Sequence, residues 1–223
     1  MVPVAEGSNP STHPNILPRG AIIPTIVRLG HAFYRYRQYV SLALLGASIL
    51  VARPLFPGSA ADRAVTIAAF ALVLLGGSVR SWAMGYHVWR RVHGPGSERS
   101  LITAGPYALV RNPLYLGTLL ISAGVALMSG SWGIILAYLV VFWLGYLAVI
   151  AWEESRMDRQ FGERYRDYLT RVPRLIPMPR IWPDRQGDFS LPTMMRCMEP
   201  VKTLGFLAAL ALMLWLKEGR AAG

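Results

Sequence analysis

The sequence predicts an all-α, polytopic membrane protein with about five transmembrane helices, on three observations. Of the 223 residues, 53% are hydrophobic and only 16% are charged, which is too apolar for an ordinary soluble domain. Long uncharged runs alternate with short basic segments. No charged residue lies between Asn112 and Trp152, a stretch about twice as long as one helix needs to cross a bilayer.

The chain is expected to begin with a flexible tail and an interfacial segment, which together cover residues 1–37. The first twenty residues contain glycine, serine, asparagine and several prolines, a composition that favours disorder. Residues 21–37 mix apolar residues with arginine and tyrosine, as segments that lie on a membrane surface do. Residues 38–223 are then expected to form a single integral membrane domain.

The apolar runs predict where the chain crosses the membrane. Glycine and serine at positions 129–133 mark a turn, so the long uncharged stretch is predicted to be a helical hairpin. Arg80 interrupts one span, and it is either an interface anchor or a functional buried charge. The predicted spans are 38–57, 64–89, 114–128, 134–152 and 203–216.

Lysine and arginine counts predict the orientation. Of 23 such residues, 18 lie in the N-terminal region, in residues 90–111 and in residues 156–202, and four lie in the opposite loop and at the C-terminus. The positive-inside rule places the N-terminus and the basic segments in the cytoplasm, and we expect a bacterial inner membrane. This distribution accounts for the net charge of +11, so we expect membrane lipids and no nucleic acid as partners. The single Cys197 excludes an intramolecular disulfide and a CxxC metal site, and we expect no metal.

Two polar segments flank the hairpin and are expected to meet at the cytoplasmic face. The first is GPYALVRNPLYLG, residues 105–117. Pro113 disfavours helix at Asn112 and leaves backbone groups free, which membranes tolerate only inside protein or beside a wet cavity. Arg111 offers a planar fork for a carboxylate. An interface anchor built from the same residue types is the alternative.

The second segment is WEESRMDRQFGERYRDYLTRVPRLIP, residues 152–177. Glu153 and Glu154 follow directly on the apolar hairpin limb, at the membrane boundary. If the helix continues, Glu153 shares a stripe with Met157 and Phe161 and could bind a cationic group or act as a base. A solvated helix end paired with neighbouring arginines is the alternative.

The first segment resembles the Gly-x-Tyr-x-x-x-Arg-His-Pro-x-Tyr-x-Gly signature of the isoprenylcysteine carboxyl methyltransferase and phospholipid methyltransferase family. The second resembles that family's Glu-Glu pair, Phe-Gly-x-x-Tyr-x-x-Tyr run and Val-Pro. The resemblance covers about residues 64–177. It implies an S-adenosyl-L-methionine-dependent membrane methyltransferase. Such a protein holds its cofactor with these cytoplasmic segments and takes a lipophilic acceptor, a phospholipid amine or an isoprenoid-like molecule, from the bilayer.

The resemblance also implies roles for individual residues. Glu153 and Arg111 are the expected catalytic residues. The expected cofactor-binding residues are Leu101, Thr103, Gly105, Tyr107, Arg111, Asn112, Pro113, Tyr115, Glu153, Glu154, Tyr165 and Tyr168.

Two departures from the family pattern concern the acceptor. Asn112 stands where the carboxyl methyltransferases have histidine, and Val149 stands where they have arginine. Neither residue can supply a cation. An amine or another neutral nucleophile is therefore favoured over a carboxylate.

Two other function classes remain open at this point. An NADPH-dependent sterol or isoprenoid reductase shares parts of both segments, although those proteins have an acidic residue where Thr118 follows Gly117. A non-catalytic membrane protein is the third reading. A soluble Rossmann-type methyltransferase is excluded, because no Gly-x-Gly-x-x-Gly follows a strand in this sequence.

Overall fold

The structure is a computed structural model and describes residues 24–86, 101–177 and 183–222. Within these ranges every regular element is a helix and none is a strand. The predicted tail, residues 1–20, lies outside the described residues. The elements are α1 (Pro24–Val51), α2 (Ala60–Tyr86), the 3-10 turn η1 (Gly105–Ala108), α3 (Pro113–Met128), α4 (Trp132–Val140), the π-helix η2 (Val141–Tyr146), α5 (Leu147–Phe161), α6 (Glu163–Arg171), α7 (Leu191–Arg196) and α8 (Glu199–Ala222).

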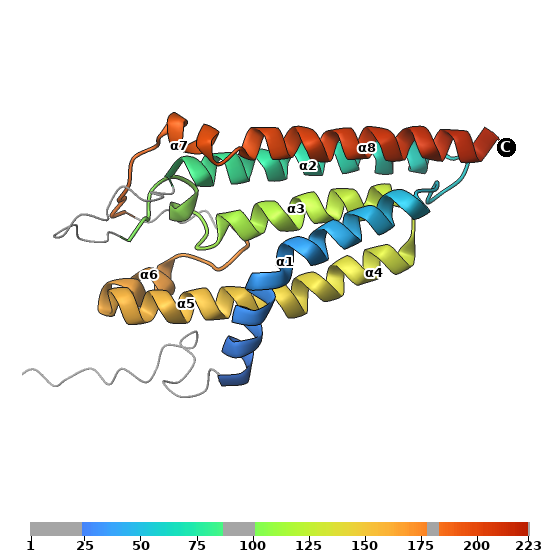
Figure 1. Cartoon of the computed structure of the whole chain (residues 1–223). Helices are drawn as coiled ribbons and strands as arrows, with labels where there is room; N and C mark the ends of the chain where they lie inside the picture. The colour runs from blue at the N-terminus through green and yellow to red at the C-terminus, as the bar shows by residue number, and fades with distance from the viewer. Residues whose placement is uncertain (1–23, 87–100, 178–182, 223) are drawn as a thin grey trace, which may run out of the picture.

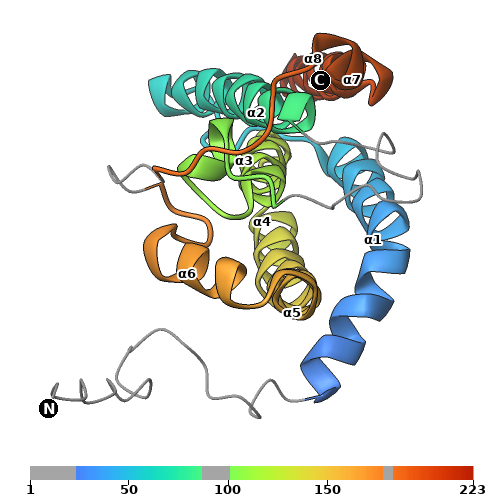
Figure 2. The same cartoon turned by 90° about the vertical axis from the view of Figure 1, so that its left-hand side faces the viewer.

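The long helices lie side by side as a bundle (Figure 1). Helices α4, η2 and α5 follow one another without a break, and we call them the rod. Helix α2 packs against α3 and α8, and α1 packs against α5. Both tight turns, between α1 and α2 and between α3 and α4, lie at one end, which we call the turn end. The elements η1, α6 and α7 lie at the other, the polar end, which faces the viewer in Figure 2.

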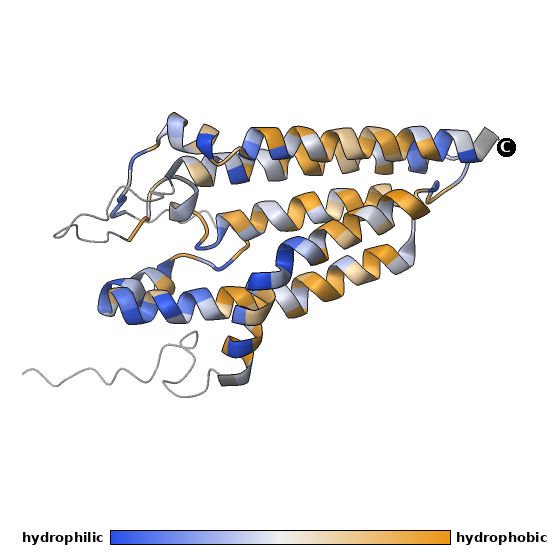
Figure 3. Cartoon of the chain, viewed as in Figure 1, coloured by the Kyte–Doolittle hydropathy of each residue, from blue (hydrophilic) through white to orange (hydrophobic). Residues whose placement is uncertain are grey.

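The hydropathy of the bundle confirms the predicted class. By length and composition, α2, the rod and α8 are each long and apolar enough to cross a membrane, and α3 is a shorter apolar helix. Apolar residues follow the helices through the bundle, whereas hydrophilic residues gather on α5 and α6 at the polar end (Figure 3). The protein is an all-α polytopic membrane protein. Its described part gives three clear spans by this measure, and the other two predicted spans correspond to α1 and α3.

Helix α1 differs from the prediction for the N-terminal region. The sequence predicts an interfacial segment that ends at residue 37 and a span that begins at residue 38. The structure has one uninterrupted helix from Pro24 to Val51. Between its first residue and Pro54 the helix contains no proline, so nothing in its backbone forces a break. Of the arginines in its first half, Arg28 and Arg35 are exposed and Arg37 is partly buried.

Polar contacts fix the turn end. The backbone nitrogen of Arg53 donates to the carbonyl of Ser129 over 3.1 Å, which joins the two tight turns. Gly130 has a φ of +61°, and a side chain there would collide with the carbonyl of Arg53. Near the C-terminus, Lys217 Nζ lies 3.2 Å from the Asp62 carboxylate. The predicted helical hairpin is confirmed, with its turn between Met128 and Trp132.

Glycines allow α2 and α3 to approach each other closely. A Cβ atom at Gly76 would lie 2.6 Å from the carbonyl oxygen of Gly117, and one at Gly117 would lie 2.6 Å from that of Gly76. Farther along, a Cβ at Gly124 would lie 2.6 Å from the carbonyl oxygen of Ala69. Small residues at such crossings let the backbones of membrane helices meet. This contact holds the start of α3 in place beside α2.

The π-helix η2 interrupts the rod beside the start of α3. Phe142 and Tyr146 of η2 are buried, and the ring centroid of Tyr146 lies 5.7 Å from that of Tyr115. Gly145 faces the ring of Phe33 on α1. Single π-turns inside α-helices often occur at functional sites. Here the π-turn precedes Glu153 and Glu154 of α5 in the same rod.

Candidate functional site

A cavity of about 700 Å³ opens among the helices at the polar end and continues into the bundle. This volume lies within the roughly 300 to 1,000 Å³ of typical small-molecule sites. Ten of the twelve residues predicted to bind the cofactor line it, although they come from segments about fifty residues apart. These ten are Leu101, Tyr107, Arg111, Asn112, Pro113, Tyr115, Glu153, Glu154, Tyr165 and Tyr168.

Arg111 joins the two polar segments. Its Nη1 donates to the carbonyl oxygens of Leu169 at 2.8 Å and Val172 at 2.7 Å, and its Nε lies 3.2 Å from Glu154. Its backbone nitrogen donates to the carbonyl of Pro173 at 2.8 Å. Pro173 and Val172 follow the end of α6, where carbonyls lack helical partners. Arg111 is therefore occupied in holding the end of α6 against the start of α3.

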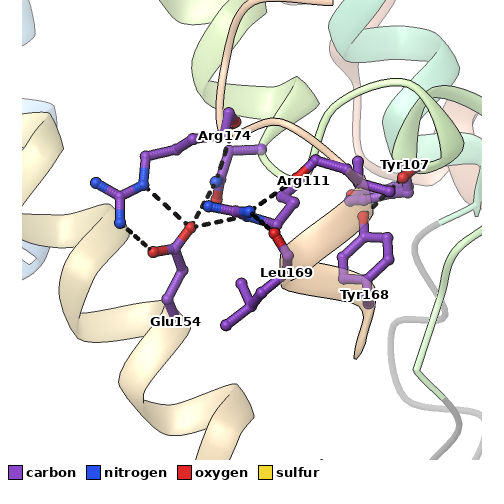
Figure 4. A network of polar contacts seen from close by, with 8 residues as sticks. Tyr107, Arg111, Glu154, Tyr168, Leu169 and Arg174 are labelled. Atoms are coloured by element: carbon purple, nitrogen blue, oxygen red, sulfur yellow. Dashed lines mark hydrogen bonds and ion pairs between the residues drawn. The ribbon is translucent and has the colours of Figure 1, made fainter. Parts of the chain in front are cut away.

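Glu154 is the hub of this network (Figure 4). Its carboxylate accepts from Arg174, with Nη2 at 2.5 Å and Nε at 3.2 Å, in addition to Arg111. The amide of Asn112 donates to Glu154 at 3.5 Å and to the carbonyl of Arg174 at 3.2 Å. Two cations and an amide thus surround one carboxylate that is only 11% exposed. Such an arrangement makes Glu154 a structural anchor.

Two tyrosines of α6 form an aromatic wall of the cavity. Tyr165 and Tyr168 are buried, in a cluster that includes Leu101. The hydroxyl of Tyr168 donates to the carbonyl of Tyr107 at 2.6 Å, which ties α6 to η1 (Figure 4). Burial raises the pKa of Tyr165 and of Tyr168 above the ordinary tyrosine value. Both hydroxyls therefore stay protonated well above neutral pH, and that of Tyr168 acts as a hydrogen-bond donor.

Glu153 has different surroundings from its neighbour. Tyr115 is a hydrogen-bond partner of its carboxylate, and Arg37 of α1 and Arg156 act on it electrostatically. Within the described residues, no ion pair within 4 Å involves Glu153, whereas Glu154 has two. The carboxylate that remains open to the cavity is therefore that of Glu153.

The other two predicted residues, Thr103 and Gly105, lie outside the cavity. Thr103 Oγ1 donates to the carbonyl of Asp184 at 2.6 Å and accepts from the backbone nitrogen of Gln186 at 3.0 Å. Gly105 has a φ of +60°, and a side chain there would strike the ring of Tyr86. Both residues hold the chain path at the polar end, so they support the site without lining it.

The sequence prediction missed the contribution of α1 to the cavity. One face of this helix lines it, through Tyr34, Arg37, Gln38, Ser41 and Leu45. The spacing of three and four residues is a helical stripe and could have revealed this face. The sequence favours an interfacial segment there, because arginine and tyrosine also suit a membrane surface.

A second missed group joins α2, α3 and α8. Arg80 Nε lies 2.8 Å from Glu199 Oε2, and Arg80 Nη1 donates to Thr118 at 2.6 Å. Lys202 Nζ lies 2.8 Å from Glu199 Oε1. All four side chains line the cavity. Of the two readings of Arg80, the structure favours the buried one, because its guanidinium faces the protein interior and is paired there.

Toward the turn end the cavity becomes apolar. Its walls there carry Leu42 and Leu45 of α1, Ile121 and Val125 of α3, and Phe206 of α8. We call this part the apolar limb. It connects the polar residues of the site with the hydrophobic part of the bundle.

Metal ligands are absent from the described part of the chain. In residues 24–86, 101–177 and 183–222, no group of three or more histidine, cysteine, aspartate or glutamate side chains could hold a metal ion.

The comparison with known families bears on the same segments. Residues 64–164 match the family model of phospholipid methyltransferases. The match covers less than half of the chain, so it shows that this segment is similar to the phospholipid methyltransferase family. The matched residues run from α2 through η1, the hairpin and α5, and they end within α6. They include the cavity residues of η1, α3 and α5, but the face of α1 and the start of α8 lie outside them.

Individual relatives match shorter stretches. Over 114 residues, the chain is 32% identical to the protein-S-isoprenylcysteine O-methyltransferase of Schizosaccharomyces pombe, covering 49% of this chain and 48% of that protein. Over 80 residues it is 35% identical to protein-S-isoprenylcysteine O-methyltransferase B of Arabidopsis thaliana, covering 36% and 41%. Over 91 residues it is 33% identical to the cobalt-zinc-cadmium resistance protein CzcN of Cupriavidus metallidurans, covering 40% and 42%. The chain thus spans about half the length of these relatives or less. No solved structure matches it significantly.

Proposed function

We propose that this protein is an S-adenosyl-L-methionine-dependent methyltransferase that acts on a lipophilic acceptor at the cytoplasmic face of a bacterial inner membrane. One observation carries the proposal. Ten of the predicted cofactor residues converge on one cavity, and the same cavity continues into an apolar limb between α1, α3 and α8. A site that is polar at one end and apolar at the other suits a reaction between a polar cofactor and a lipid-like acceptor.

The donors and faces at the polar end fit this cofactor. Tyr107, Tyr165 and Tyr168 offer aromatic faces for a base, and the open carboxylate of Glu153 suits a cationic group. The Arg111–Glu154 network holds these residues in place, since it joins η1, α3, α5 and α6. We therefore propose Glu153 as the polar partner of the cofactor or acceptor. Arg111, which the sequence suggests as catalytic, is proposed as a positioning residue.

Methyl transfer from a sulfonium needs little acid or base catalysis from side chains. Held by the residues of the two polar segments, S-adenosyl-L-methionine would supply an electrophilic methyl group on its sulfonium to a lone pair of the acceptor. The protein must align the acceptor and exclude water. The buried tyrosines and the closed network around Glu154 serve both needs at the polar end.

The acceptor is proposed to be an amine or another neutral nucleophile. Val149 is fully buried in the hydrophobic cluster with Phe142 and Ile150, so it offers nothing to a carboxylate. Asn112 is engaged with Glu154 and the carbonyl of Arg174. The isoprenylcysteine methyltransferases among the relatives leave an isoprenoid-like acceptor as the alternative.

Two experiments test the function. Purified protein in detergent should be stabilised against heat by S-adenosylhomocysteine and not by NADPH; at a ligand concentration one hundred times Kd the gain is about 2.7 kcal/mol. Membranes incubated with methyl-labelled cofactor should then transfer label to an extractable lipid, which mass spectrometry can identify. Stabilisation by NADPH alone would favour a reductase, and stabilisation by neither ligand would overturn the proposal.

A further inference from the structure

Arg37 of α1 has a guanidinium group that the protein leaves unpaired. Within the described residues, only two side chains have a buried nitrogen or oxygen without a hydrogen bond, Arg37 at Nη1 and Lys217 at Nζ. Lys217 lies in an ion pair with Asp62 at the turn end. Arg37 forms neither a hydrogen bond nor an ion pair with any part of the chain that the structure describes. A buried guanidinium nitrogen without a partner costs stability unless a ligand pairs with it.

The guanidinium is nevertheless held in a defined orientation. Its central carbon lies 3.8 Å from the ring centroid of Tyr34, one turn earlier on α1. Stacking on an aromatic face uses the flat side of the guanidinium and leaves its in-plane donors free. Both residues line the cavity. The Tyr34 ring therefore fixes the plane of a guanidinium at the cavity wall, and donors in such a plane suit an oxyanion.

The charges around the cavity follow one pattern. Each of its three carboxylates faces two cations. Glu154 contacts Arg111 and Arg174, and Glu199 contacts Arg80 and Lys202, all within ion-pair distance. Glu153 faces Arg37 and Arg156 without a direct ion pair. Arg174 contacts Glu154 from outside the cavity, so five cations and three carboxylates line it, an excess of two positive charges. Among the described residues that line the cavity, the two cations that act on Glu153 have no ion pair within 4 Å.

The position of Arg37 on its helix indicates which ligand this is. Ser41 and Leu45 follow Arg37 on the same face, so the stripe turns from charged to apolar within about 12 Å, at 1.5 Å per residue. A molecule with its anionic group at Arg37 would extend its tail along Leu42 and Leu45 in the apolar limb. Its other side would face Glu153.

We infer that Arg37 binds an anionic oxygen group, a phosphate or a carboxylate, on the lipophilic methyl acceptor. This inference rests on the proposed function, because it names a feature of the acceptor. The anion is a recognition group that lies apart from the nucleophile. An acceptor with a neutral nucleophile a few bonds from its anion meets both requirements.

Binding of amphiphiles with the same twelve-carbon tail tests this assignment. Radiolabelled dodecyl phosphate would be bound to protein purified in dodecyl maltoside and competed with dodecanoate and with dodecanol. We expect the wild type to bind at least one of the two anions more tightly than dodecanol. Arg37→Gln should lower that affinity about tenfold or more, the effect of losing one charge-assisted hydrogen bond. The stronger of the two anions would show whether the group is a phosphate or a carboxylate.

A matched control lies two residues away. Arg35→Gln removes the same charge from an exposed position of α1 and should leave the affinity unchanged. Arg37→Lys keeps the charge without the fork and should fall between the wild type and Arg37→Gln. Equal binding of dodecanol and both anions by the wild type would overturn the inference, as would full anion affinity in Arg37→Gln.

The cofactor provides an independent readout. Thermal stabilisation by S-adenosylhomocysteine should persist in Arg37→Gln, because Arg37 takes no part in the network around Glu154. That result would also show that the variant is folded; should it fail to fold, the comparison between wild type and Arg37→Lys decides. Wild-type protein that binds dodecyl phosphate but not S-adenosylhomocysteine would remove the methyltransferase proposal and leave the anion site standing.

Discussion

Glu153 and Glu154 are neighbours in the sequence, yet they have separate tasks in the structure. Successive residues of an α-helix point about 100° apart, so one carboxylate turns toward the end of α6 and the other toward α1 and α3. Glu154 is surrounded by Arg111, Arg174 and Asn112. Glu153 faces Tyr115. At this scale, one carboxylate anchors the site and the other is available to a ligand.

Substitution of Glu153 should therefore affect binding more than folding. In Glu153→Gln, the charge is lost but the shape and the Arg111–Glu154 network remain. We expect affinity for S-adenosylhomocysteine to fall about tenfold or more, since hydrogen bonds to charged groups contribute roughly 1.5–3 kcal/mol. Calorimetric titration measures this, and the melting temperature should stay close to that of the wild type. Glu163→Gln, at an exposed position of α6, is the control. Unchanged affinity in Glu153→Gln would refute the assignment.

Substitution of Arg111 should affect both cofactor binding and the stability of the fold. Arg111→Ala leaves the carbonyls of Leu169 and Val172 without a donor and removes one cation from Glu154. We expect a loss of roughly 1.5–3 kcal/mol in the free energy of unfolding, together with weaker cofactor binding. Arg111→Lys should recover little, because an ammonium cannot span both carbonyls and the carboxylate.

Thermal denaturation in detergent measures the stability change. Arg159→Ala serves as the control, because Arg159 is exposed and donates to Ser155 on the same helix. A variant Arg111→Ala that melts like the wild type but has lost turnover would instead return Arg111 to a catalytic role.

Among the elements, the contact between α2 and α3 sets the position of the site most tightly. Gly76 and Gly117 bring the two backbones together, and Arg80 and Thr118 meet at the same level. The start of α3 carries Tyr115, and only Asn112 separates it from Arg111. A change in the spacing of these two helices would therefore move the cavity walls.

Gly117→Ala should destabilise the bundle. Its Cβ would lie 2.6 Å from the carbonyl oxygen of Gly76, a backbone atom that cannot move by itself. Overpacking of this kind costs about 1–3 kcal/mol. Gly205→Ala on α8 is the matched control, because a Cβ there meets no atom within 4 Å among the described residues; it should be neutral or stabilise by up to about 1 kcal/mol. Melting temperatures of the two variants in one detergent compare them, and equal values would refute the close contact.

For the whole molecule, both tight turns and the end of α8 lie at the turn end, whereas the cavity opens at the polar end. This arrangement agrees with the charge distribution of the sequence, in which Arg53, Arg63, Lys217 and Arg220 are the few cations opposite the basic segments. The polar end is accordingly proposed to face the cytoplasm.

Cysteine labelling tests this orientation. In a Cys197→Ser background, Ser131→Cys places a thiol at the hairpin turn and Arg185→Cys places one at the polar end. In intact cells, a membrane-impermeant maleimide should label position 131 and spare position 185 until the membrane is opened. Labelling of both thiols from the same side would contradict the proposed topology.

The sequence predicts the structure well where particular residue types mark a turn or a polar segment. The hairpin turn is marked by glycine and serine, and the two polar segments are marked by proline, arginine and paired glutamates. Because these segments flank the hairpin, their meeting could be predicted from topology alone. The roles of Glu153 and Glu154 could not be separated, since the sequence does not show which face of α5 meets α6.

The sequence does not predict contacts between helices that lie far apart along the chain. Arg80 and Glu199 are 119 residues apart, and no local pattern connects them. Arg37 carries a helical stripe, but its residue types also suit a membrane surface. In both cases the prediction depends on which helices are neighbours, and the sequence by itself does not show this.

The π-helix in the rod sets the angular phase between its two halves. A π-turn accommodates one residue more than an α-turn, so residues after Tyr146 are rotated by about 100° relative to an unbroken α-helix. If one residue of the turn, such as the exposed Leu144, were deleted, the rod could close into a regular helix. Tyr138 could then keep its place on the cavity only if Glu153 swung away from Tyr115. The extra residue thus sets the rotation between the two parts of the rod. The part before η2 faces the apolar limb, and the part after it faces the polar site.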